Sequence, residues 1–311
     1  MNPAYSVILF TTASGAGYGL LALSGLAAAG HGPASSIGFA LACVGVALAL
    51  ITTGLLSSTA HLGRPERFLR AFSQWRSSWL SREGVVAVAT YPVALAFLAV
   101  WSGLVEAPAL IAPLGIATAA LCAVTVYCTS MIYRQLTTIP AWANRFTVPG
   151  YLLFALATGA GLLSFISVVF GRFQAGAGNF QAFLTLILIF AVIVLKWLYW
   201  RWLRRRKPEH SMAAATGLGP GVRQWEVPHT ARNFIMKEMG YSVARAHARR
   251  LQQIAMLLLD VAFIATFISP KFPWAVAVSA PALLLAAWTE RWLFFAQAEH
   301  VVQLFYGQEK V

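Results

Sequence analysis

Charged side chains are scarce in this sequence of 311 residues: they make up 11% of it, whereas 59% of the residues are hydrophobic. So little polar surface excludes an ordinary soluble domain of this length. The hydrophobic residues instead form long runs, and a helix needs about 20 mainly apolar residues to span a bilayer. The sequence therefore predicts an integral membrane protein with helical spans. Transmembrane barrels are excluded, because their strands alternate in character over roughly 10 residues.

Cysteine is rare, and the common nucleotide- and metal-binding motifs are lacking. Cys43, Cys122 and Cys128 fall in apolar runs without C-x-x-C spacing, which predicts buried packing residues and no disulfide framework. We find no P-loop, G-x-G-x-x-G or H-E-x-x-H motif, so nothing indicates nucleotide hydrolysis or proteolysis. Because the first ten residues contain no Lys or Arg, we expect the first apolar run to be retained and not cleaved as a signal peptide.

Eight apolar runs meet the length of a span, some of them marginally, and predict an all-α polytopic fold. We expect them to form a single membrane domain over residues 1–311. The predicted spans are approximately Tyr5–Ala29, Ser36–Ala60, Glu83–Leu104, Ala109–Tyr133, Pro149–Phe170, Asn179–Trp200, Leu251–Ser269 and Trp274–Phe295.

The basic residues are distributed unevenly between the two sides of such a membrane domain. The net charge of +13 would suggest nucleic acid for a soluble protein, but here topology explains most of it. With eight spans, 21 of the 23 Lys and Arg residues fall on the side of both termini, which leaves Arg172 and Lys271 opposite. Cytoplasmic loops are rich in Lys and Arg, so we predict that both termini and a long basic loop at about 201–250 are cytoplasmic.

An arginine-rich segment from His61 to Glu83 separates the second predicted span from the third. Aromatic residues interleave its five arginines, which favours a segment lying along the membrane surface with apolar anchors. We interpret it as a docking platform for a soluble partner subunit. The alternative is that its charge follows the positive-inside rule and contacts anionic lipid. The expected docking residues are Arg64, Arg67, Arg70, Trp75, Arg76 and Trp79.

His61 closes the second predicted span and Glu83 opens the third, so both are expected at one membrane boundary. Ionisable groups in such places are functional candidates. A histidine and a carboxyl group suit a quinone, whose reduction takes up two protons. The alternative is structural: His61 bonds a loop carbonyl, and Glu83 lies at a helix N-terminus capped by Ser81. Arg82 belongs to the same site or neutralises Glu83, and the residues alone leave these interpretations open.

Two further carboxyl groups lie inside predicted spans, Asp260 in the seventh and Glu290 in the eighth. Arg291 is a local partner for Glu290. Since no redox or binding motif surrounds either group, we expect structural pairing between helices. The alternative is a proton- or ion-coupled transporter that uses Asp260 and Glu290 as its coupling carboxylates.

Histidines that could hold a b-type haem are lacking at mid-membrane depth. Such a haem needs two histidines on facing helices, whereas the six in this chain lie at span ends or in loops. We therefore expect no haem and no metal site on this chain. Electrons would then arrive from a partner subunit that holds its own centres.

Several separated motifs resemble the membrane-anchor subunits of dimethyl sulfoxide reductase-type molybdenum oxidoreductases. His61-Leu-Gly63 and Leu80-Ser81-Arg82-Glu83 are similar to that family's H-L-G and L-S-x-E elements. Tyr133–Trp142 is similar to its motif after the fourth span, and Glu290–Phe295 to a looser element in its last span. The resemblance covers the whole chain and is strongest between His61 and Trp142.

The resemblance implies an eight-helix, haem-free anchor in the bacterial inner membrane. Such an anchor binds menaquinone or ubiquinone next to an iron–sulfur subunit. The iron–sulfur subunit exchanges electrons with a molybdopterin catalytic subunit. His61 and Glu83 would then be the quinone-site residues, and no catalytic residue would lie on this chain.

The long basic sixth loop, with Pro228-His229-Thr230 and Lys237-Glu-Met-Gly240, looks more like the anchor of cytoplasmic sulfite dehydrogenases. The predicted topology agrees, because it puts His61 and Glu83 on the cytoplasmic side. We therefore favour sulfite oxidation coupled to quinone reduction. The alternatives are the anchor of a dimethyl sulfoxide reductase that oxidises quinol, the transporter, and a purely structural tether.

Overall fold

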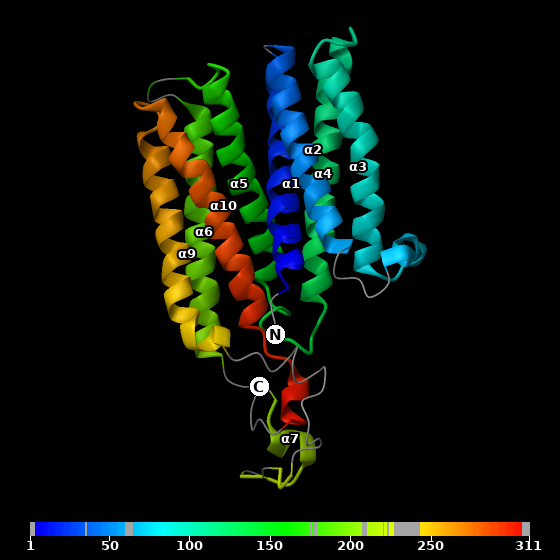
Figure 1. The fold of residues 1–311 in the computed structure, drawn as a ribbon, viewed down its shortest axis with the longest axis vertical. Helices are drawn as coiled ribbons and strands as arrows, with labels where there is room; N and C mark the ends of the chain where they lie inside the picture. Colours follow the sequence, from blue (N-terminus) through cyan, green and yellow to red (C-terminus); the bar gives the residue numbers. More distant parts are fainter. Residues whose placement is uncertain are drawn as a thin grey trace.

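The computed structural model describes residues 4–34, 36–59, 65–174, 176, 179–206, 210–219, 221–222, 224–226 and 243–306. Over these ranges the fold is all-helical, as predicted, and its long helices lie side by side in one bundle (Figure 1). The eight long helices of this part of the chain are α1 (Tyr5–His31), α2 (Ile37–Thr59), α3 (Trp79–Trp101), α4 (Ile111–Arg134), α5 (Thr147–Val169), α6 (Phe180–Arg205), α9 (Val243–Ile268) and α10 (Val276–Ala296). Shorter helical turns are η1 (Pro65–Gln74), η2 (Pro108–Leu110), α7 (Met212–Thr216), η3 (Pro273–Ala275) and η4 (Val301–Leu304).

Each predicted span corresponds to one long helix. In the described part of the chain seven helices, all but α10, are long and apolar enough to cross a membrane. Helix α10 has 21 residues but carries Glu290 and Arg291 in its last turns, which lowers its hydropathy. The chain is therefore a polytopic membrane protein, and the eighth span stays a prediction.

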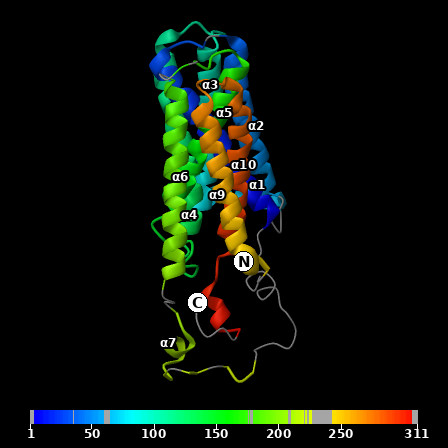
Figure 2. The same cartoon turned by 90° about the vertical axis from the view of Figure 1, so that its left-hand side faces the viewer.

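The connections between the helices divide between two ends of the bundle. One end holds η1, the 135–146 connection, α7 and η4 (Figures 1 and 2), and we call it the basic end because Arg134, Arg145 and the arginines of η1 lie there. The other end holds the short α1–α2, α3–α4, α5–α6 and α9–α10 connections, with Arg172 and Lys271. The predicted asymmetry of charge is therefore present in the fold.

Helix α9 begins at Val243, well before the predicted seventh span. The segment that ends in Arg249 and Arg250 continues into the span as one helix. At the other side of the sixth loop, α6 extends to Arg205, so the described loop is shorter than the predicted 201–250 segment.

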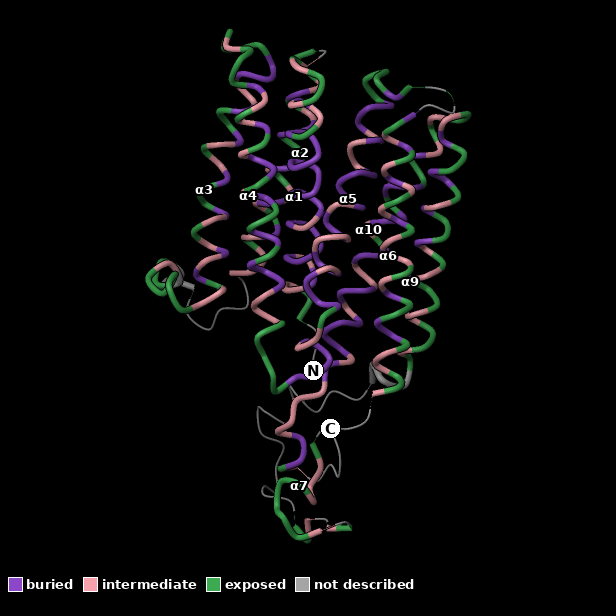
Figure 3. Tube along the Cα trace, turned by 180° about the vertical axis from the view of Figure 1, so that it is seen from behind, coloured by how far each residue is buried: buried purple, intermediate pink, exposed green. Residues whose placement is uncertain are grey.

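Helix α1 forms the centre of the bundle, with α2, α3 and α4 on one side and α5, α6, α9 and α10 on the other (Figure 1). Most of α1 is buried, whereas the outer helices expose apolar faces (Figure 3). The three cysteines are buried and unpaired, which confirms their predicted role in packing. Small residues let α1 and α5 approach closely, because interhelical contact in a membrane relies on tight packing of backbones.

Gly19 and Gly159 form the tightest point of this contact. A Cβ atom at Gly19 would lie 1.7 Å from the carbonyl oxygen of Ala155, and one at Gly159 would lie 2.2 Å from the carbonyl carbon of Gly19. Neither clash can be relieved by a side-chain rotation, because the opposing atoms are backbone.

Replacing Gly19 with Ala should therefore force α1 and α5 apart. We expect Gly19→Ala to lower stability by about 1–3 kcal/mol or more, the usual cost of overpacking, measured as the thermal unfolding midpoint in detergent. Gly45→Ala is the matched control, because Gly45 lies on α2 with open space where its Cβ would be. Equal midpoints for the two variants would contradict the close approach of α1 and α5.

Candidate functional site

Glu83 lies in the first turns of α3, close to the basic end. The helix begins at Trp79, and the side chain of its N-cap Ser78 accepts a hydrogen bond from the backbone N–H of Ser81. The structural alternative, in which Ser81 caps a helix that starts at Glu83, is therefore wrong in its choice of cap. Ser78 is the N-cap because its backbone is extended, which is the conformation that an N-cap requires, whereas Ser81 is already helical.

The Glu83 side chain is buried, with 4% of the residue exposed. The hydroxyl of Thr129 on α4 donates a hydrogen bond to its Oε1 atom. The Thr129 Oγ1 atom also lies 3.0 Å from the carbonyl oxygen of Thr125, so this hydroxyl has two acceptors within reach. A buried carboxyl group is costly unless it is hydrogen-bonded, and Glu83 thus lies in a specific contact between α3 and α4 and does not face solvent.

Arg82 is directed away from this contact and towards the loop. Its Nε atom donates to the carbonyl oxygen of Trp75 at 3.0 Å, and its Nη2 atom donates to that of Arg76 at 2.6 Å. The guanidinium also lies over the ring of Trp79, 4.3 Å from its centroid. Arg82 therefore connects the turn after η1 to the start of α3. In these contacts Arg82 is not a counter-charge for Glu83.

His61 and Arg64 lie outside the described residues, and the side chain of Arg67 is likewise not described. Arg70, Trp75 and Arg76 lie on η1 and the turn after it, which project sideways from the basic end (Figure 1), and Trp79 is the first residue of α3. Arg70 and Arg76 are exposed, and Trp75 is 52% exposed. Trp79 packs edge-on against Tyr127 of α4 at 5.7 Å, so it anchors this segment to the bundle.

The sequence motifs at Tyr133–Trp142 and Glu290–Phe295 come together in the fold. Trp142 is buried, stacks on Phe294 with ring centroids 5.5 Å apart, and donates its Nε1 proton to the Phe294 carbonyl oxygen at 2.8 Å. Tyr133 meets Phe295 edge-on at 5.3 Å. These motifs therefore join the 135–146 connection to the end of α10.

A buried ionic cluster joins α6 to α10, and one of its members, Lys196, was not predicted from the sequence. Lys196 Nζ lies 2.5 Å from Glu290 Oε1, and Arg291 forms an ion pair with Glu290 Oε2. All three residues are at most 4% exposed. The expectations that Glu290 pairs between helices and that Arg291 is its local partner are thus confirmed, whereas Lys196 was not recognised as a partner. The sequence signal that could have indicated a buried ion pair was a single Lys inside an apolar run.

Asp260 is exposed on α9, far from this cluster. Ser279 of α10 donates to the carbonyl oxygen of Ala262, so Asp260 is nearly level with Ser279. Glu290 lies three turns beyond Ser279 along α10, about 16 Å at about 1.5 Å per residue, which separates it from Asp260 by more than two turns. The expected pairing of Asp260 with another helix is not found among its described neighbours, and the two carboxylates do not form one site.

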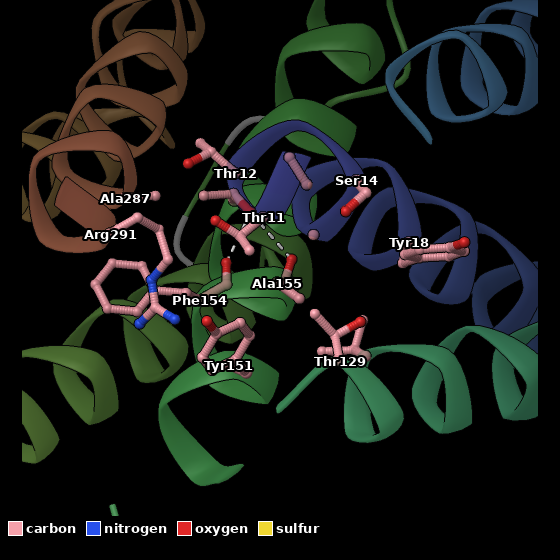
Figure 4. A pocket seen from close by; sticks show the side chains of 14 residues that line it. Thr11, Thr12, Ser14, Tyr18, Thr129, Tyr151, Phe154, Ala155, Ala287 and Arg291 are labelled. Carbon is pink, nitrogen blue, oxygen red and sulfur yellow. Dashed lines mark hydrogen bonds between the residues drawn. The ribbon is translucent and has the colours of Figure 1, made fainter. Parts of the chain in front are cut away.

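A small cavity opens between α1, α4, α5 and α10 at the depth of Thr129 (Figure 4). Its polar lining includes Thr11, Thr12, Thr129, Tyr151 and Arg291, and its volume is about 20 Å³. Thr129 thus connects Glu83 on one side to this cavity on the other. Within the described part of the chain, no three His, Cys, Asp or Glu side chains gather as a metal site would require.

The comparison with protein families identifies the group to which this arrangement of helices and motifs corresponds. The family model of the DMSO reductase anchor subunit (DmsC) matches residues 1–296, nearly the whole chain. The chain belongs to this family. It is therefore a membrane-anchor subunit of a molybdenum oxidoreductase, and the resemblance drawn from its motifs is confirmed.

A relative of this anchor subunit comes from Allochromatium vinosum, where it is named as the C component of a sulfite dehydrogenase. The two sequences are 32% identical over 338 aligned positions, which cover 98% of this chain and 99% of the relative. The similarity to a sulfite dehydrogenase component agrees with the interpretation of the sixth loop. Anchor subunits of this kind imply partner subunits for catalysis and electron transfer, which hold the cofactors.

Proposed function

We propose that this anchor subunit passes electrons between a partner iron–sulfur subunit and quinone in the membrane, with sulfite oxidation on a molybdopterin subunit as the electron source. The observation that carries this proposal is Glu83, a buried carboxyl group held by Thr129 next to the arginine-rich segment that contains η1. This combination places a proton-exchanging group close to the surface on which a soluble partner would dock.

A quinone that is reduced at this site takes up two electrons and two protons. Glu83 fits such a ligand because it is a proton donor at the membrane boundary, in an environment that excludes bulk water. His61, in the segment directly before η1, would supply the second ionisable group. Thr129 holds the Glu83 carboxyl in place, so that its proton lies at a defined position.

The basic end would face the cytoplasm of a bacterial cell, with the anchor in the inner membrane. Arg70, Arg76, Arg134 and Arg145 lie at this end, whereas Arg172 and Lys271 lie in the opposite connections. Positive charge in short loops sets orientation during insertion. A partner docked on the η1 segment would then be cytoplasmic, as sulfite oxidation inside the cell requires.

The exposed arginines of η1 and the following turn would hold the iron–sulfur subunit through charge complementarity. Arg70, Arg76 and Trp75 are exposed there, while Trp79 is fixed against the bundle. Arginine and tryptophan are common at the centres of protein interfaces. The same geometry would serve a dimethyl sulfoxide reductase, in which quinol is oxidised, so the catalytic partner decides the direction of electron flow.

A transporter that uses Asp260 and Glu290 is disfavoured by the positions of these residues. Glu290 is held by Lys196 and Arg291, whereas Asp260 is exposed on another helix more than two turns away along the bundle. The ion pairs give Glu290 a structural role. The two groups therefore offer no shared ion site.

Affinity purification of this chain in mild detergent tests the assembly. We expect molybdenum and iron in stoichiometric amounts, together with a large pterin subunit and an iron–sulfur subunit that lacks an export signal. An Arg70→Glu, Arg76→Glu double variant should lose both partners, while an Arg172→Glu variant at the opposite end should retain them. A chain that purifies alone and without metal would contradict the proposal.

A further inference from the structure

The cavity between α1, α4, α5 and α10 contains polar groups that the bundle leaves unsatisfied. The Nη1 atom of Arg291 is buried and has no hydrogen-bond partner among the described residues, and the Tyr151 hydroxyl is buried beside this guanidinium. Tyr151 is 5% exposed and Arg291 is 4% exposed. Figure 4 shows the Arg291 guanidinium and the Tyr151 hydroxyl close together on one side of the pocket, with Thr129 on another side.

One residue of α1 adds to this set. Thr12 and Tyr18 line the same cavity, and the buried Thr12 hydroxyl has no partner in the described part of the chain, whereas Figure 4 shows the Tyr18 hydroxyl pointing away from the pocket. Most buried polar groups in proteins are hydrogen-bonded, to protein or to ordered water. The unsatisfied Arg291 Nη1 and Thr12 hydroxyl at one cavity therefore indicate a bound molecule that donates and accepts hydrogen bonds.

The size and charge of the cavity select water as that molecule. The volume is about 20 Å³, and one water needs about 10–15 Å³ together with two to four polar partners. The Arg291 charge disfavours a cation. Arg291 already pairs with Glu290, which removes much of its attraction for a second anion.

We propose that this cavity is a water site and that its water continues the Glu83–Thr129 hydrogen bond to Tyr151 and Arg291, forming the path by which Glu83 regains a proton. This inference rests on the proposed role of Glu83 in quinone reduction. The path is short: Tyr151 lies four residues after the start of α5, and Arg291 lies five residues before the end of α10, both near the basic end.

The proton balance of this path is simple. Glu83 gives its proton to the bound quinone and becomes a carboxylate, while the electrons come from the partner subunit. Thr129 then passes its hydroxyl proton to the carboxylate and takes a proton from the cavity water. The cavity water takes a proton from the Tyr151 hydroxyl, and this hydroxyl takes one from bulk water at the basic end, while Arg291 stays protonated and orients the water. Each proton consumed is thus replaced by one from the aqueous phase.

The first test is a cryo-EM map of the assembled complex at a resolution that shows waters. We expect density for a water within hydrogen-bonding distance of Tyr151 and Arg291. A cavity without density, or one filled by an ion or a lipid chain, would overturn the proposal. This readout does not depend on turnover, so it stands even if the complex fails to reduce quinone, which would contradict the proposed function instead.

The second test changes the path without removing Glu83. Thr129→Val keeps the shape of the side chain but removes the hydroxyl. We expect quinone reduction to slow by about tenfold, less than the roughly 100-fold or more for losing a general acid or base itself, with a larger solvent deuterium isotope effect. Thr129→Ser should restore both values. Thr118→Val on the same helix is the control, because Thr118 is buried without lining the cavity. An unchanged rate and isotope effect in Thr129→Val would refute the path.

Discussion

A Glu83→Gln variant should reduce quinone about 100-fold more slowly than the wild-type complex, the lower range for loss of a general acid or base. The amide keeps the size of the side chain and can still accept the Thr129 hydrogen bond, but it cannot donate a proton to a reacting oxygen. The measurement is the rate of sulfite-driven quinone reduction by the purified complex in lipid vesicles.

The control for this variant is electron transfer that bypasses the anchor. Sulfite-driven reduction of a water-soluble artificial acceptor by the partner subunits should keep its wild-type rate in Glu83→Gln. Wild-type quinone reduction in the variant would show that Glu83 has only the structural role that its burial between α3 and α4 also permits.

Glu290→Gln should destabilise the anchor by about 3–5 kcal/mol, the usual cost of removing one partner from a buried ion pair. The variant leaves Lys196 and Arg291 as two buried cations without a counter-charge, and both lie in the interior of the bundle. We expect a lower thermal unfolding midpoint in detergent and less anchor in the membrane.

Asp260→Asn is the matched control, because it neutralises a carboxylate that is exposed on α9. Substitutions away from specific contacts usually change stability by at most about 0.5 kcal/mol. If Glu290→Gln and Asp260→Asn unfold at the same temperature, charge compensation in the Lys196–Glu290–Arg291 cluster is not what holds α6 against α10.

Long-range pairing explains what sequence analysis could and could not predict here. Apolar length identified every long helix, because a span is a local property of about 20 consecutive residues. Lys196 and Glu290 are 94 positions apart, and no local pattern indicates that α6 and α10 bring them together. Lys196 was therefore only one of the 21 basic residues assigned to the side of both termini, although it lies inside an apolar run.

Only part of the candidate site could be predicted, because its contacts also join residues that are far apart in the sequence. Glu83 was identified because a carboxyl group at the edge of a span is rare, and its motif strengthened the assignment. Its partner Thr129 could not be found, because a threonine inside an apolar helix is common and usually bonds its own backbone. The start of α3 was also misplaced, since Ser78 and Ser81 are both acceptable caps in sequence and only the backbone conformation separates them.

The measurement that tests the central claim most directly is quinone reduction by the purified wild-type complex in lipid vesicles, driven by sulfite and followed by quinone absorbance. Our account predicts that sulfite reduces quinone only when this chain is present, and that the partner subunits without it reduce only soluble acceptors. Equal quinone reduction with and without this chain would contradict the account and leave it a structural tether.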